Sequence, residues 1–360
     1  MSVLEDRYRS VLRMLPASYR EVWEEEMVST FLESTDTGDA DEAEFRADFG
    51  RPGLSEVASV AALAARLRFG GTDAGPRSYA WGEAVRQVAL VGFLAYAAHT
   101  TVLSVRSIWL SGALAWLPPL GGSTSWAQPA PTGLWPTLAE HAGLVWLGAF
   151  LALVFGRRRA AAVLAVAGVL VPLSDMTLDV ATNGEPVMVW PWFGIGVSAV
   201  LVLALAAFHS GAPPVRPAPW LGAFGVGLLV GGVSEFVFLR QDVPMPSPLE
   251  WPAVACVVMV VAAVIHLGRP SSPPWYGAPS WSLALASLSV IVLGQRVVSL
   301  VDLLRTAGPY PGRSTMITLA VAEALGVLAV LLPLVVVTVR ALRRLPETGT
   351  TVADSWAPSP

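Results

Sequence analysis

Long apolar stretches separated by short links rich in Pro, Gly and Ser fill most of the chain after residue 86. Each stretch comes close to the roughly 17–25 residues that an α-helix needs to cross a bilayer. Pro and Gly end helices, so links such as GAPPVRPAP and GRPSSPPWYGAPS separate the stretches. The pattern predicts eight membrane-spanning helices, at about 86–105, 140–156, 159–178, 189–208, 220–239, 251–268, 281–303 and 315–339.

The first 76 residues follow a different pattern, in which apolar positions recur at helical spacing among many charges. An acidic stretch, DTGDADEAEFRADFG, precedes an Ala-rich helical segment after Pro52, so this region should form three or four short helices with a small core. The apolar positions at helical spacing in its first half are Leu4, Tyr8, Val11, Leu12, Leu15, Val22, Met27, Phe31 and Leu32.

These patterns together predict an all-α fold with three parts. Residues 1–76 form a small cytoplasmic helical domain, and residues 77–345 form a polytopic bundle of about eight transmembrane helices. Residues 346–360, rich in Thr, Ser and Pro, form a disordered cytoplasmic tail.

Composition supports a membrane protein and excludes several chemistries. Hydrophobic residues make up 54% of the chain and charged ones only 14%, against about 25% charged in a typical soluble domain. All 23 basic residues are Arg, so a P-loop lysine or a Schiff-base lysine is absent. The single cysteine, Cys256, excludes an intrachain disulfide and a Cys-rich metal site. We therefore expect no enzyme activity and no cofactor.

Charge is distributed unevenly along the chain. Residues 1–86 carry 10 Arg and 16 acidic residues, a net charge of −6, which disfavours nucleic-acid binding by this region. Ten arginines of the bundle links fall on one predicted side of the membrane and four on the other. The positive-inside rule then places both termini in the cytoplasm, with the first span acting as the targeting signal. Arg without Lys also indicates a GC-rich, bacterial source, so we expect a multi-pass protein of the bacterial cell membrane.

Ionisable side chains within the spans are the candidate functional residues, because a lone charge in hydrocarbon is costly. They gather in the outward half of the bundle, where Arg296 is expected to be neutralised by Glu235, Asp175 or Glu323. This predicted cluster is either an ion-pair network that fixes helix packing or a pocket for a ligand or ion. Its members are His99, Arg106, Asp175, Asp179, Glu235, Arg296, Asp302 and Glu323.

A glycine pair lies on the same helix face as one of these acids. Gly227, Gly231 and Glu235 are spaced i, i+4, i+8, and a G-x-x-x-G pair lets a second helix approach closely. The spacing predicts that Glu235 is delivered to that helix contact.

Two further arrangements bear on cofactors. Asp175 and Asp179 share a helix face, but two carboxylates make an incomplete cation site. The histidines form two pairs, one toward each membrane face, as axial haem ligands do. Because they lie near helix ends, ordinary hydrogen bonds are the preferred interpretation for His99 with His141, and for His209 with His266.

The segments YRSVLRMLPASYREVWEEEMVSTFLE and FGRPGLSEVASVAALAARL resemble the N-terminal helical domain of many actinobacterial multi-pass membrane proteins, related to HAAS-type and permease-prefix domains. The resemblance covers about residues 4–70. It implies a cytoplasmic regulatory or interaction module, sometimes encoded beside a PadR-like transcription regulator, and assigns no catalytic residue.

Two functions fit these patterns. The chain is expected to be a non-enzymatic regulator or sensor whose cytoplasmic helical domain, residues 1–76, binds a cytosolic protein such as a PadR-like regulator. The alternative is a transporter or permease subunit for a small or lipidic solute, which would need an ATPase partner because the chain has no ATP-hydrolysing motif. A membrane-embedded enzyme finds support only in the Asp175/Asp179 pair.

Overall fold

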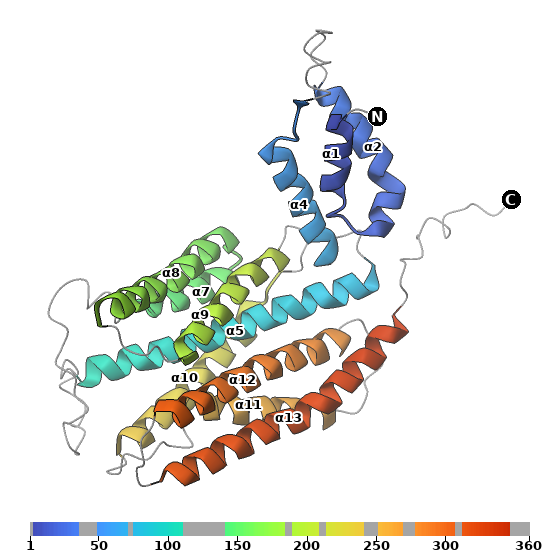
Figure 1. Cartoon of the computed structure of the whole chain (residues 1–360). Coiled ribbons are helices and arrows are strands. Elements are labelled where there is room, and N and C mark those ends of the chain that lie inside the picture. Colours follow the sequence, from blue (N-terminus) through green and yellow to red (C-terminus); the bar gives the residue numbers. More distant parts are fainter. Residues whose placement is uncertain are drawn as a thin grey trace. The chain divides into compact units, whose positions relative to one another are not determined.

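The computed structural model describes residues 3–35, 49–70, 75–110, 141–183, 189–208, 214–240, 251–268, 278–306 and 312–345 (Figure 1). These residues form eleven α-helices and one short 3-10 segment, and no strand, so the predicted all-α fold is confirmed. Their contacts define two units. The head contains the first three helices and the start of α5 (Pro76–Leu110) up to Glu83, and the bundle runs from Ala84 to Arg344. The predicted tail, 346–360, lies outside the described residues.

The head is built from α1 (Val3–Leu12), α2 (Ala17–Thr35) and α4 (Leu54–Arg68). Its core is centred on Tyr8, whose ring stacks on that of Phe31 with centroids 4.0 Å apart. Burial of the Tyr8 side chain raises its pKa, and the negative charge of Glu56 adds a smaller increase. The buried core residues are Leu4, Tyr8, Leu12, Leu15, Val28, Phe31, Val60, Ala64 and Leu67.

One predicted core position of the head is wrong. Val22 is 68% exposed, whereas Val28, which was not among the predicted positions, is buried. Phe31 follows Val22 by nine residues, or two and a half helical turns, so the two side chains leave α2 on opposite sides. Because Phe31 is fixed against Tyr8, Val22 points to solvent.

Among the described residues of the bundle, seven helices are long and apolar enough to cross a membrane, which supports a multi-pass membrane protein. Two of them contain an internal proline, Pro172 and Pro333. The helices are α5 (Pro76–Leu110), α8 (Arg158–Asn183), α9 (Val189–Ala204, continued by the 3-10 segment Leu205–Ala207), α10 (Pro217–Arg240), α11 (Trp251–Gly268), α12 (Ala278–Thr306) and α13 (Arg313–Arg344).

The predicted second span, 140–156, is shorter than expected. Its helix, α7, runs from Leu144 to Val154 and has 11 residues, a length of about 16 Å, roughly half of the ~30 Å hydrocarbon layer. Trp146, Phe150 and Leu153 on this helix are almost fully buried. Hydropathy alone indicated a span here, because a helix surrounded by other helices can be as apolar as one that faces lipid.

Although short, α7 reverses the direction of the chain. The ring of Trp146 packs against Phe93 and Tyr96 of α5, and Gly143, three residues earlier, lies against Thr100. Residue numbers therefore rise on α7 as they fall on α5, so the helices are antiparallel. Gly156, at φ 75°, then forms the turn into α8.

Helices α5 and α10 run parallel and in register. A Cβ on Gly227 would lie 3.2 Å from the Ala98 Cβ, and one on Gly231 would lie 3.1 Å from Val102. Both pairs differ by 129 residues, and each partner advances by four. In the structure the helix that lies against the glycine pair is α5.

The long helix α5 belongs to two apolar cores. Leu90 and Phe93 pack in a cluster with α7, α8 and α9, while Ala84 and Val88 pack in a second cluster with α11, α12 and α13. Figure 1 shows α5 between these two groups of helices.

We name the two ends of the bundle by their residues. At the arginine end, the Arg86 guanidinium lies 5.3 Å from the centre of the Phe208 ring, and Arg158 donates a 2.7 Å hydrogen bond to the Phe208 carbonyl. Helix α8 begins there, and the bundle part of α5 begins there at Ala84. The far end is where α5 and α12 finish, near Arg106 and Asp302.

The parallel register can be tested by cross-linking. In a Cys256→Ala background, Ala98→Cys with Gly227→Cys should form a disulfide on mild oxidation in bilayers, because their Cβ atoms lie close to the bonding separation of about 3.5–4.5 Å. Protection from a thiol-reactive mass tag measures the bond. Ala98→Cys with Gly222→Cys is the matched control, since Gly222 faces open space, and equal cross-linking of both pairs would contradict the register.

Candidate functional site

The first polar contact of the far end links α5 to α10. Arg106 Nη1 lies 3.0 Å from Glu235 Oε2, and the two side chains are 31% and 23% exposed. The pair continues the register of the glycine contacts, because 106 and 235 also differ by 129. Gly227 and Gly231, about one helical turn apart, let the backbones of α10 and α5 come close together. One turn further along, the same two helix faces carry the opposite charges of Glu235 and Arg106.

The second contact is more deeply buried and links α12 to α13. Arg296 Nη2 lies 2.6 Å from Glu323 Oε2, and the side chains are only 9% and 10% exposed. Of the three partners that the sequence allowed for Arg296, the structure therefore pairs it with Glu323. A buried charge of this kind is tolerated only when an opposite charge and hydrogen bonds compensate for the lost solvation.

Asp302 has a different role from the ion pairs. Its carboxylate accepts hydrogen bonds from the backbone N–H of Val189, at 3.1 Å, and of Trp190, at 2.8 Å. These groups belong to the first turn of α9, whose N–H groups have no partner within the helix. A negative charge here also interacts favourably with the helix dipole. Asp302 thus caps α9 from a helix more than 110 residues away.

The remaining predicted members are His99, Asp175 and Asp179. The ring of His99 stacks on Trp251 of α11, with centroids 4.5 Å apart. Asp175 and Asp179 lie on α8, but their side chains are outside the described part of the structure. The predicted cluster is therefore resolved as contacts between different helix pairs: α5 with α10, α12 with α13, α12 with α9, and α5 with α11.

A second polar layer, at the arginine end, was not predicted. Gln87 Nε2 of α5 lies 3.5 Å from Ser280 Oγ, and His266 Nε2 of α11 lies 2.8 Å from Ser282 Oγ. Both serines are on α12 and are almost fully buried. The signal was the seven-residue spacing of Ser282, Ser289 and Arg296, which places them on one side of α12. The sequence prediction depends on charged side chains as markers, so it does not include these neutral serines.

Of the described histidines, only His266 shows the predicted ordinary hydrogen bond, because His99 makes a ring contact and His141 Nδ1 is buried without a hydrogen-bond partner among the described residues. His266 hydrogen-bonds to a serine and His99 stacks on a tryptophan, whereas His209 lies outside the described residues. Cys256 is a free, buried thiol. Among the described residues, no three His, Cys, Asp or Glu side chains come together as metal ligands would.

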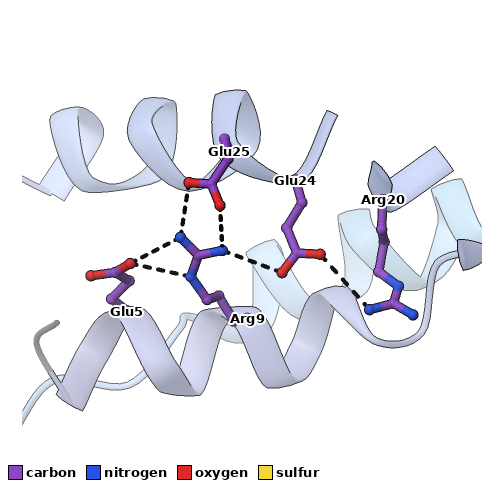
Figure 2. Close-up of polar contacts among 5 residues, drawn as sticks. All are labelled: Glu5, Arg9, Arg20, Glu24 and Glu25. Carbon is purple, nitrogen blue, oxygen red and sulfur yellow. Dashed lines mark hydrogen bonds and ion pairs between the residues drawn. The ribbon is translucent and has the colours of Figure 1, made fainter. Parts of the chain in front are cut away.

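In the head, one arginine joins α1 to α2 (Figure 2). Arg9 contacts Glu5 on its own helix at 3.1 Å and, across the interface, Glu24 at 3.4 Å and Glu25 at 2.8 Å. Arg20 lies 3.8 Å from Glu24. The hydrogen bonds and positive charge of Arg9 lower the pKa of the Glu25 carboxyl.

Removing one partner of the deep ion pair should be costly. Arg296→Gln should destabilise the bundle by about 3 kcal/mol, because Glu323 would remain buried and uncompensated. The double variant Arg296→Leu with Glu323→Leu should recover most of that loss. Thermal unfolding in lipid nanodiscs measures the effect. Arg106→Gln, in the more exposed pair, should cost less than about 1 kcal/mol, and equal costs for the two arginine variants would contradict this ranking.

The Arg9 contacts predict an acid dependence of head stability. Folding lowers the pKa of Glu25, so the stabilisation is present at neutral pH and is lost as the pH falls below the unfolded value of 4.5 toward the folded-state pKa. Glu25→Gln should therefore flatten the decline in this window. A ¹⁹F-labelled phenylalanine at the buried position of Phe31 reports head unfolding in the full chain. Glu26→Gln is the control, and an identical acid profile for Glu25→Gln and the unaltered chain would refute the assignment.

Comparison with protein-family models, with characterised proteins and with solved structures gave no match. The resemblance of residues 4–70 to HAAS-type domains therefore stays a prediction from the sequence. The functional argument rests on the geometry of the head and the bundle.

Proposed function

We propose that the chain is a non-enzymatic regulator or sensor of the bacterial cell membrane, with both termini in the cytoplasm, whose head binds a cytosolic protein. The observation that carries the proposal is the head itself. It has its own apolar core and its own ion-pair network, and it forms a contact unit apart from the bundle. A unit with its own core can bind a partner protein through its own surface.

The bundle supports a cytoplasmic head through its distribution of arginine. Arg86 and Arg158 lie at the end where α8 and the bundle part of α5 begin, and the start of α5 belongs to the head. Helix α13 ends with Arg343 and Arg344. The positive-inside rule favours the cytoplasm for this end.

The proposal is tested by cross-linking in cells that express the full chain. A cytosolic protein, for which a PadR-like regulator or an ATPase subunit is the expected kind, should be recovered with the full chain and lost when residues 1–70 are deleted. Leu12→Ala tests whether the head must be folded to bind its partner. Leu12 is fully buried in the head core, and truncation of such a side chain costs about 2–5 kcal/mol of stability. Recovery of the same proteins with and without the head would refute the proposal.

A transporter or permease subunit is the second candidate, and one observation favours it. Arg296 Nε is buried and has no hydrogen-bond partner among the described residues, so this guanidinium can still donate to a polar solute. A cysteine at Ser299, one turn away on α12, distinguishes the two functions. In a Cys256→Ala background, a membrane-impermeant maleimide should label Ser299→Cys if a solute pathway reaches Arg296, and should not label it if the pair only fixes packing.

A further inference from the structure

The outer side of α2 combines apolar and acidic side chains. Val22, Glu26, Ser29 and Glu33 are spaced by four, three and four residues, so they form one stripe along the helix. All four are exposed, and the stripe lies on the side of α2 away from the buried Phe31. We call this stripe, with Trp23 at its edge, the outer face of α2. Val22 is 68% exposed and Trp23 is 44% exposed.

The acids of this face are not used by the fold of the head. Arg9 and Arg20 contact Glu24 and Glu25, which lie to the side of α2 nearer α1 (Figure 2). Glu26 and Glu33 make no ion pair with any described residue. The outer face therefore presents two uncompensated carboxylates beside two large apolar side chains.

We propose that the outer face of α2 is the docking site for a basic amphipathic helix of the cytosolic partner. The inference rests on the proposed function, that the head binds a protein, and adds the surface and the chemistry of the partner. Apolar side chains of the partner cover Val22 and Trp23. Arginine or lysine side chains about seven residues apart contact Glu26 and Glu33, since seven helical residues span about 10.5 Å on both helices.

Charge and residue type select this occupant over two others. An anionic membrane surface would be repelled by Glu26 and Glu33, and a second copy of α2 would bring like charges together. Tryptophan is the residue type that most often dominates binding energy in protein interfaces. Trp23 is held in place by a ring contact with Tyr19, at 6.3 Å between centroids, so little order has to be gained on binding.

The test uses the full chain in nanodiscs and a fluorescent helical peptide of about 18 residues, with leucine on one face and arginine at two positions seven apart. Its counterpart carries glutamate at those two positions. The arginine peptide should bind about tenfold more tightly at low salt, and 0.5 M salt should remove most of this preference. Fluorescence anisotropy measures both affinities.

Variants separate the two halves of the face. Glu26→Gln with Glu33→Gln should abolish the preference for the arginine peptide, while Trp23→Ala should weaken binding about tenfold at low and high salt alike. Asp6→Asn is the matched control, because Asp6 is an exposed acid on α1, and it should change the affinity by less than about twofold. Equal binding of the two peptides, or an equal effect of Asp6→Asn, would overturn the proposal.

Failure of this inference is distinct from failure of the proposed function. If cross-linking recovers a head-dependent partner from cells and the outer-face variants leave its recovery unchanged, the head binds a protein through another surface. If no head-dependent partner is recovered, the proposed function itself fails, whatever the peptides show.

Discussion

The arrangement of the bundle depends on how the buried polar groups of α12 are satisfied. A hydrocarbon environment offers no hydrogen-bond partners, so each such group must find one on another helix or on its own backbone. Ser280 contacts α5, Ser282 contacts α11, Arg296 contacts α13 and Asp302 contacts α9. Ser289 donates to the carbonyl of Leu285. Helix α12 therefore specifies which helices surround it, which apolar packing alone would leave less well defined.

The second organising element is α5, which supplies apolar contacts where α12 supplies polar ones. It faces α7, α8 and α9 through one core and α11, α12 and α13 through another. Its in-register contact with α10 ends in the Arg106–Glu235 pair. The bundle is thus two groups of helices joined by a shared apolar helix and by the Asp302 cap.

How far the sequence predicted these features differs with their range along the chain. Local spacing was sufficient for most spans and for the glycine contact, because periodicity and length are properties of one helix. Local spacing could not identify the partner of Arg296. Glu235, Asp175 and Glu323 lie on three different helices, and only the packing of the helices decides which of them meets Arg296. The same holds for Asp302, whose partners are backbone groups with no side-chain signal. The prediction for Val22 is wrong because the contact of Phe31 with Tyr8 decides which side of α2 faces the core, and local spacing does not show that contact.

The short helix α7 has a consequence for how the protein is assembled. Eleven residues are too few to hold a segment across a bilayer by hydrophobicity alone. The residues that cover it belong to α5, which precedes it, and to α8, α9 and α10, which follow the turn at Gly156. A helix this short stays buried at this position only while its neighbours surround it, so the place of α7 depends on the packing of the whole group and not on its own length.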